Sequence, residues 1–282
     1  MLLIRETKRM ARIDIAAIRK IEDPEERYNT ALRIFEDARA EASKEISAEL
    51  DSKGIPRMVA ANIAGVDVGG FTKRLQGQFT LPPLAITKLC YNCLKKSAHM
   101  VFAGEEGVTM LPRTLSLALN SLKGKKASAR NAALLYSLSL FEKNTREAAL
   151  NDELTFPQLL RSRLTEIAED KGIYTIGLAG TDAPSSLKLC IRKCFEHENY
   201  SGRLNTLFYI ACIGNHTSLD GLIAPNPVAF TQLCYYTENY ENREIITDKT
   251  IRRIVSIYYD LNNENRNRLL IYLFNEHWSD SK

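Results

Sequence analysis

The sequence predicts an all-α protein, and three observations carry that prediction. Glycine and proline number only 14 and 9 in 282 residues, so helices can run for long stretches without interruption. Leu, Ile, Ala, Lys, Glu and Arg dominate most segments, whereas stretches in which Val, Ile and Thr alternate with polar residues are scarce. Apolar residues make up 45% and charged residues 26% of the chain, which is the usual balance of a folded globular protein. A chain of this length is expected to hold two domains or one elongated helical body.

The first predicted element is a long helix over residues 15–54 that breaks near Asp23 and Pro24. Its second part carries apolar residues at steps of three and four, which mark one buried face: Tyr28, Leu32, Phe35, Ala38 and Ala42. Glycine is favoured just past the end of a helix and proline in the first turn, so Gly54 and Pro56 predict a stop followed at once by a new start. We assign residues 1–33 to an N-terminal helical segment.

A run of short helices is predicted next, over residues 34–103, because glycine or proline recurs at short intervals: Gly65, Gly77, Pro82, Pro83 and Gly104. Residues 104–150 are expected to form a helical hairpin. Its two arms are the apolar stretches 115–122 and 132–141, and the linker between them is basic, with Lys123, Lys125, Lys126 and Arg130.

The second half is predicted to continue as helix after helix. Thr155 and Gln158 have the spacing of a capping box, which opens a helix that runs to about Lys171. We divide this half into a helical domain over residues 151–223 and a C-terminal helical region over residues 224–282. Six tyrosines of the C-terminal region fit either helix packing or a surface for dimerisation or partner binding: Tyr235, Tyr236, Tyr240, Tyr258, Tyr259 and Tyr272.

The two halves resemble each other at an offset of about 118 residues. The segment from Ser47 to Ile55 is similar to residues 165–173, and residues 89–94 are similar to residues 207–212. The arms of the hairpin correspond to residues 251–261 and 269–278. These matches predict an internal duplication in which each half is a bundle of short helices followed by a helical hairpin.

The net charge of +4 is unevenly distributed. Between residues 53 and 130, twelve basic side chains face three acidic ones, a local net charge of +9 that leaves −5 for the rest of the chain. The basic residues are Lys53, Arg57, Lys73, Arg74, Lys88, Lys95, Lys96, Arg113, Lys123, Lys125, Lys126 and Arg130. A local excess of this size is expected of a protein that binds a polyanion.

Other function classes find little support in the sequence. The four histidines are scattered, no glycine-rich phosphate loop is present, and we expect neither catalysis nor a cofactor. Two cysteine pairs, Cys90 with Cys93 and Cys190 with Cys194, could supply four thiolates to zinc, but small apolar core positions are the preferred interpretation, so no metal is expected. The first ten residues are too polar for a secretory signal or a membrane span, which predicts a cytoplasmic protein without a membrane partner.

Residues 47–102 carry a recognisable series of landmarks. Gly54, Gly65 and Gly77 are expected at helix ends, and Asp67 can cap a helix that buries Phe71. The preceding helix is expected to face inward with Val59, Ala60 and Ile63. Val66 is expected to fill the angle between these two helices. This pattern resembles the phage-repressor, or XRE-type, helix-turn-helix family, which has a lambda-repressor-like fold of five helices. The resemblance implies a transcriptional regulator that binds double-stranded DNA as a homodimer.

In this family, the second helix of the motif lies in the major groove. By position, the resemblance assigns base contacts to Val68, Gly69, Thr72 and Lys73, with Asp67 at the start of the same helix. The remaining predicted DNA-binding residues are Arg57, which would meet a phosphate or buttress that contact, Arg74 at a phosphate, and Gln76 and Gln78 at the exit loop. Three of the first positions of this helix, Val68, Gly69 and Gly70, depart from the pattern because they offer no side chain that hydrogen-bonds to bases. We therefore expect binding that rests mainly on phosphate contacts.

A second, degenerate copy of the motif is suggested over residues 157–223. Asp182 is expected to cap its second helix, in which Ser185, Ser186, Lys188 and Arg192 are possible DNA contacts. The turn glycine is missing there, so packing or dimerisation is an equal alternative. For the whole chain, the alternative to a DNA-binding regulator is a helical adaptor or antirepressor that keeps the fold and binds a protein.

Overall fold

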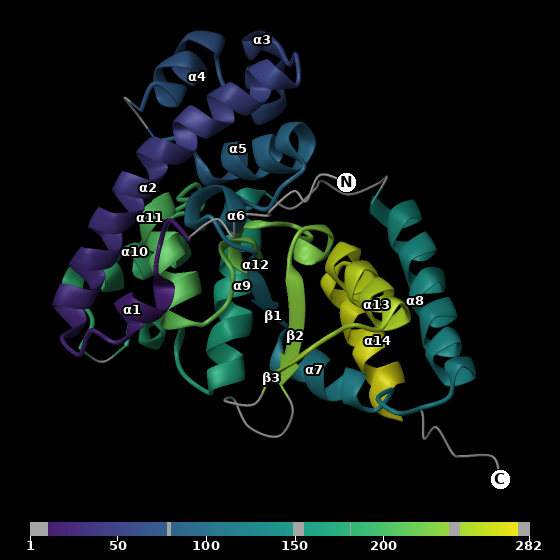
Figure 1. The fold of residues 1–282 in the computed structure, drawn as a ribbon. Coiled ribbons are helices and arrows are strands. Elements are labelled where there is room, and N and C mark those ends of the chain that lie inside the picture. The colour runs from purple at the N-terminus through teal and green to yellow at the C-terminus, as the bar shows by residue number, and fades with distance from the viewer. Residues whose placement is uncertain (1–10, 78–79, 149–154, 181, 237–242, 276–282) are drawn as a thin grey trace, which may run out of the picture.

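A long helix forms the spine of the first half of the chain. The computed structural model describes residues 11–77, 80–148, 155–180, 182–236 and 243–275 (Figure 1). After the short helix α1 (Ile15–Arg19), the helix α2 runs from Pro24 to Ser52. Asp23 caps it by accepting the N–H of Glu26 at 2.6 Å, and Pro24 occupies the first turn, which confirms the predicted break.

Four short helical elements follow α2, as predicted. They are α3 (Arg57–Ala64), α4 (Val68–Leu75), α5 (Pro83–Lys88), which continues into the π-helical segment η1 (Leu89–Leu94), and α6 (Ala98–Ala103). Gly54, Gly65 and Gly77 have φ values of +64°, +71° and +82°, a left-handed conformation that favours glycine. Their predicted role as helix stops is confirmed.

The first half ends in one strand and two helices, and the second half ends in two strands and two helices. The first half closes with β1 (Val108–Met110), α7 (Arg113–Asn120) and α8 (Ala127–Ala148). The second half consists of α9 (Phe156–Lys171), the 3₁₀ segment η2 (Thr175–Ala179), α10 (Ser185–Glu196), α11 (Leu204–Phe208), the π-helical segment η3 (Tyr209–Gly214), α12 (Leu219–Ile223), the 3₁₀ segment η4 (Pro227–Ala229), β2 (Gln232–Tyr236), β3 (Arg243–Ile245), α13 (Lys249–Asp260) and α14 (Asn263–Asn275). The predicted capping box of Thr155 and Gln158 opens α9.

The chain is mostly helical, which confirms the helical fold class in its main part, but it also contains a small sheet that was not predicted. A three-stranded sheet in the order β1-β2-β3 lies at the centre of the molecule (Figure 1). Strand β1 pairs parallel to β2, with Thr109 opposite Leu233, and β2 pairs antiparallel to β3, with Tyr235 opposite Glu244. Strands of three to five residues show no clear alternation, and the partners β1 and β2 lie more than 100 residues apart in the sequence, so no local pattern indicates the pairing.

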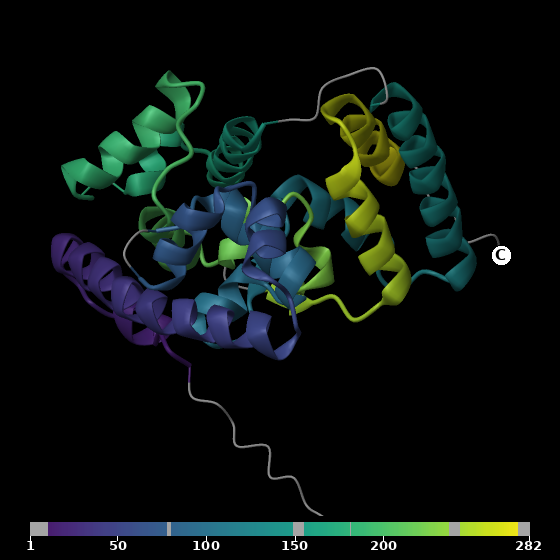
Figure 2. The same ribbon diagram turned by 90° about the horizontal axis from the view of Figure 1, so that it is seen from above.

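Side chains from both halves build each of two hydrophobic cores. The first core joins residues 13–103 to residues 156–223, and the second joins residues 111–140 to residues 228–273. In Figure 2, α2 (purple) and α10 (green) lie on one side, whereas α8 (teal) lies with α13 and α14 (yellow) on the other. The segments predicted as 34–103 and 151–223 therefore share one core, and those predicted as 104–150 and 224–282 contribute to the other.

The two halves meet through reciprocal contacts at α6 and α12. The carboxylate of Asp220, on α12, accepts the backbone N–H groups of Ala98 and His99 at 2.8 Å each. In return, Nδ1 of His99, on α6, accepts the N–H of Leu219 at 3.3 Å. Each helix therefore supplies an acceptor for the first-turn donors of the other, since these donors have no partner within their own helix.

Candidate nucleic-acid interface

Helices α3 and α4 are joined by a tight turn at residues 65–67, at the end of the molecule farthest from α14 (Figure 1). Gly65 takes the left-handed conformation that reverses the chain, and Val66 donates its N–H to Ala61 O at 3.1 Å. Asp67 then accepts the N–H of Gly70 at 2.6 Å and begins α4. The predicted roles of Gly65 and Asp67 in this turn are confirmed, and the carboxylate of Asp67 is engaged as a helix cap.

The inward face of α3 differs from the prediction. Ala60, Ala61 and Ala64 are buried, whereas Val59 is 41% exposed and Ile63 is only half-buried. The expectation that Val59 points inward was wrong, because the small alanines form the inner arc of the helix and let α4 and α5 approach closely. On α4, Phe71 and Leu75 are buried as expected, and they fix which side of the helix remains exposed.

The outer face of α4 is formed by Val68, Gly69, Lys73 and Gln76, all exposed. Thr72 is half-buried, and its hydroxyl donates to Val68 O at 2.9 Å, so its proton is already engaged. Lys73 has no carboxylate within ion-pair distance in the described part of the chain. Of the base-reading residues that the resemblance assigns, Lys73 is therefore the one with a free charged donor.

The two glycines at the start of α4 differ in their surroundings. A Cβ added at Gly70 would lie 2.5 Å from Asp67 Oδ2 and 2.9 Å from Arg74 Nη1, so this position must stay small while Asp67 caps the helix. A Cβ at Gly69 would meet only Asp67 Oδ1, at 3.5 Å, which is ordinary contact. Gly70 is explained by packing, whereas nothing in the structure requires a glycine at position 69.

The two arginines predicted near phosphate differ in their surroundings. Arg57 donates from Nη2 to both carboxylate oxygens of Asp51, at 2.9 and 2.8 Å, and to Ser47 Oγ at 2.6 Å, so it fastens α3 to α2. Arg74 is half-buried, lines a narrow crevice beside Arg39, and its Nε is buried without a partner among the described residues. Arg57 is therefore engaged within the fold, and Arg74 is partly withdrawn from solvent. Gln78 lies outside the described residues.

The fold also reduces the positive charge counted along the sequence. Five of the twelve basic side chains pair with acids that lie outside residues 53–130: Lys53 and Lys96 with Glu49, Arg57 with Asp51, Lys123 with Glu244, and Arg130 with Asp248. Burial acts to raise the pKa of Glu49, but its hydrogen bonds to Lys96 and Lys53 lower it below the usual value. Lys73, Lys88 and Lys95 remain exposed on this lobe.

A group of exposed apolar side chains accompanies the basic ones and was missed by the sequence-based reasoning. Met58 is 60% exposed and Val59 41% on α3, and Val68 is 39% exposed at the start of α4. Apolar residues at helical spacing are normally placed in the core, so only the packing of α3 against its neighbours shows that these three face outward.

The predicted second copy of the motif, over residues 157–223, differs in structure from the α3–α4 region. The element before α10 is the 3₁₀ segment η2 instead of an α-helix, and α10 begins after Pro184, so the expected cap by Asp182 was wrong. Ser185 and Ser186 are exposed in the first turn, and Lys188 is half-buried. Arg192 pairs with Glu196 at 3.4 Å.

All six cysteines are buried thiols. Within the described ranges, no group of three or more His, Cys, Asp or Glu side chains is arranged to hold a metal ion. None of the helices described here is both long and apolar enough to cross a membrane. Comparison with protein-family models, with curated proteins and with solved structures finds no match to this chain.

Proposed function

We propose that this chain is a cytoplasmic DNA-binding regulator that docks α4 on duplex DNA, mainly through the phosphate backbone. The observation that carries the proposal is the outer face of α4, where an unpaired cation, Lys73, lies beside a residue without a side chain, Gly69. Repressors with this motif bind paired half-sites as dimers, so a homodimer belongs to the proposal.

The start of α4 offers a second means of binding phosphate. The first-turn N–H groups of a helix have no partner within the helix, and Asp67 satisfies only that of Gly70. The N–H groups of Val68 and Gly69 can donate to a phosphate oxygen, and the missing side chain at Gly69 lets the DNA backbone approach closely. The carboxylate of Asp67 opposes this binding electrostatically, which agrees with modest affinity and weak base discrimination.

The test is a titration of the full chain with a fluorescent duplex of mixed sequence at several salt concentrations. Each phosphate contact contributes about −0.9 to the slope of log K against log salt, so loss of Lys73 should reduce the slope by about 1. Lys73→Ala is the informative variant, because Arg57 and Arg74 also hold the fold. Lys126→Ala, which removes an exposed lysine of the other lobe, is the matched control.

A protein partner is the second candidate, and the exposed group Met58, Val59 and Val68 favours it. Clustered apolar side chains on a surface mark binding sites more often than isolated ones do. If DNA is the ligand, the double variant Met58→Ser with Val68→Ser should leave DNA affinity almost unchanged. The only expected loss is that of apolar contacts with thymine methyl groups. If an adaptor function is correct, the same double variant should abolish partner capture, and Lys73→Ala should not.

We also infer that the two halves arose by duplication. Support comes from the π-helical segments η1 and η3, which each follow a short helix and precede a helix capped by a serine, Ser97 or Ser218. These segments begin 120 residues apart, close to the offset of the sequence similarity. The ion pair of Arg192 and the changed turn before α10 favour packing as the role of the second copy.

A further inference from the structure

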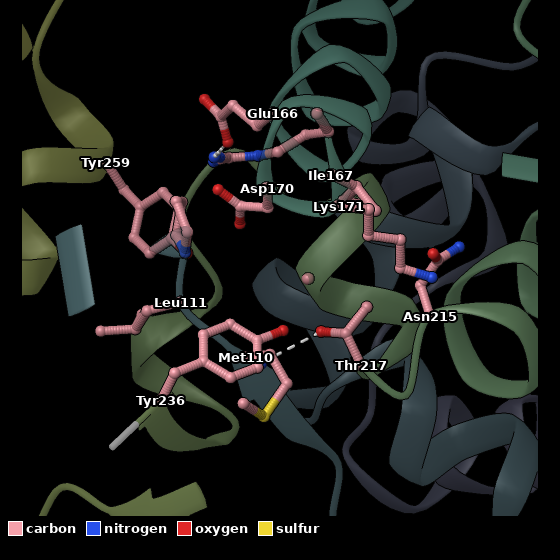
Figure 3. Close-up of a pocket in the computed structure, with 13 residues that line it drawn as sticks. Met110, Leu111, Glu166, Ile167, Asp170, Lys171, Asn215, Thr217, Tyr236 and Tyr259 are labelled. Carbon is pink, nitrogen blue, oxygen red and sulfur yellow. Dashed lines mark hydrogen bonds and ion pairs between the residues drawn. The ribbon is translucent and has the colours of Figure 1, made fainter. Parts of the chain in front are cut away.

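A crevice opens where the two cores meet, far from α3 and α4. Its walls come from α9, the ends of β1 and β2, the loop after η3, and α13, and it contains about 480 Å³ of unfilled space, including the part open to solvent. In Figure 3, Asp170, Tyr259 and Tyr236 surround this space on one side, and Lys171 and Asn215 lie on the other. These residues come from segments that are distant in the sequence, so only the fold brings them together.

A wider hollow adjoins the crevice, and the described residues of its lining include three basic ones and no acidic one. The hollow shares Met110, Lys171, Asn215 and Tyr236 with the crevice, adds Gly214, His216 and Arg243, and contains about 950 Å³ of unfilled space that opens to solvent. Lys171 ends α9, whereas Arg243 begins β3, so the two cations come from segments that are distant in the sequence. Among the described residues, neither has a carboxylate within ion-pair distance.

The local electrostatics also favour an anion. Partial burial, together with the positive charges of Arg19, Arg243 and Lys171, lowers the pKa of His216 to about 4. Burial also lowers the pKa of Lys171, whose ammonium donates to Gly214 O at 3.1 Å. Both shifts reflect partial withdrawal from water, and that of His216 also reflects the positive charges around it, which favour an anion. His216 also has a φ of +54°, a conformation that is uncommon for non-glycine residues and is found more often at functional sites than elsewhere.

Two buried polar groups in the crevice walls lack a partner within the described residues. Asn215 is 8% exposed, and its Nδ2 donates to Ile210 O, but its Oδ1 accepts no hydrogen bond. Arg163 is 3% exposed and is held by Glu166 and by Pro225 O, but its Nε has no acceptor. Buried polar groups are nearly always paired, so an unpaired acceptor and an unpaired donor in one crevice indicate a place for a polar guest.

We propose that the hollow and crevice together bind a small organic anion that also carries a hydroxyl or amino donor. The anionic group, a carboxylate or a phosphate, lies between the ammonium of Lys171 and the guanidinium of Arg243, beside the neutral ring of His216. The donor group reaches Oδ1 of Asn215. Because α9 contributes to the first core and β3 pairs with β2, which contributes to the second, an anion bound by Lys171 and Arg243 links the two cores.

Calorimetric titration of the full chain at low ionic strength tests this proposal, with inorganic phosphate, malate and succinate as separate probes. Malate and succinate differ by one hydroxyl, so the proposal predicts saturable binding of each anion and tighter binding of malate than of succinate. Lys171→Gln, which can keep the hydrogen bond to Gly214 O, and Arg243→Gln should each weaken binding by about tenfold or more, as expected for loss of one charged contact. Lys126→Gln should bind like the wild type.

Three outcomes overturn the proposal. The first is the absence of saturable binding for all three probes, which would mean that the site holds water only. The second is an equal loss of affinity in Lys126→Gln, which would indicate general charge screening. Equal affinity for malate and succinate would refute the role of Asn215 as the acceptor. Unliganded variants are compared by thermal unfolding, and since no DNA is present, the result is independent of the proposed DNA-binding function.

Discussion

Replacing Asp220 by alanine tests whether α6 and α12 hold the two halves of the chain together. Asp220 is fully buried, and its carboxylate accepts three hydrogen bonds at 2.8 Å, from the hydroxyl of Tyr91 and from the N–H groups of Ala98 and His99. Burial raises the pKa of Asp220, whereas these three donors act to lower it. The carboxylate therefore satisfies donors from two segments of the opposite half of the chain.

The expected loss follows from the groups that the substitution leaves behind. Each buried donor without an acceptor costs about 1–3 kcal/mol, and the half-buried hydroxyl of Tyr91 can recover part of this by reaching water. Removal of a desolvated carboxylate offsets another part. We expect Asp220→Ala to lower the free energy of unfolding by about 3–5 kcal/mol, because three neutral donors lose their acceptor and these two effects offset part of the cost.

Denaturant unfolding at pH 7, followed by circular dichroism, measures this loss. Asp23→Ala is the control, because Asp23 caps α2 from an exposed position and should cost only about 1 kcal/mol. Asp220→Asn keeps one acceptor oxygen and should lie between the two. If Asp220→Ala costs no more than Asp23→Ala, the contact between the halves does not depend on this carboxylate, and the reasoning fails.

Three further predictions concern single residues. Gly69→Ala should stabilise the protein by up to about 1 kcal/mol. Gly70→Ala should destabilise it, because the added Cβ would displace the carboxylate of Asp67 that caps α4. Equal effects of the two variants on the melting temperature would contradict the difference in space around the two glycines. Burial raises the pKa of Asp170 to about 6, so this carboxyl makes the folded state less stable as the pH rises from about 4 to 6. The variant Asp170→Asn can still accept the N–H of Arg113. Its stability relative to the wild type should therefore increase with pH, by about 1–2 kcal/mol at pH 7.5. A difference in stability that does not vary with pH would refute the role of the Asp170 carboxyl. Burial, assisted by the charge of Arg19, lowers the pKa of His99 to about 4. The folded state therefore loses stability as the pH falls from about 6.5 to 4, which is the opposite of the effect of Asp170. His99→Asn should reduce this loss, and acid unfolding of the wild type and the variant measures the difference.

Local features of the fold could be predicted from the sequence because they depend on neighbouring residues. The glycine stops at Gly54, Gly65 and Gly77, the cap at Asp67 and the capping box at Thr155 all rest on backbone conformations that few residue types allow. The inward face of α3 could not be predicted in the same way. Hydrophobicity favoured Val59 over Ala61 and Ala64, whereas the close approach of neighbouring helices required small side chains.

Features that depend on distant segments had no local signal. The parallel pairing of β1 with β2 joins strands from the two halves, and the bonds of Asp220 to Ala98 and His99 span more than 100 residues. The candidate interface shows the same limit. Arg57 and Arg74 were assigned to phosphate by position, but the pairing of Arg57 with Asp51 and the burial of Arg74 Nε emerge only from tertiary packing. The residues around the crevice were not found, because no motif unites Lys171, Asn215 and Arg243.

The salt dependence of DNA binding by wild type and Lys73→Ala tests the central claim most directly. The account predicts that wild-type affinity for a mixed-sequence duplex falls steeply with salt, and that the slope of log K against log salt is smaller by about 1 in Lys73→Ala and unchanged in Lys126→Ala. A flat salt response in the wild type, or the same slope in Lys73→Ala as in the wild type, would contradict docking of α4 on DNA.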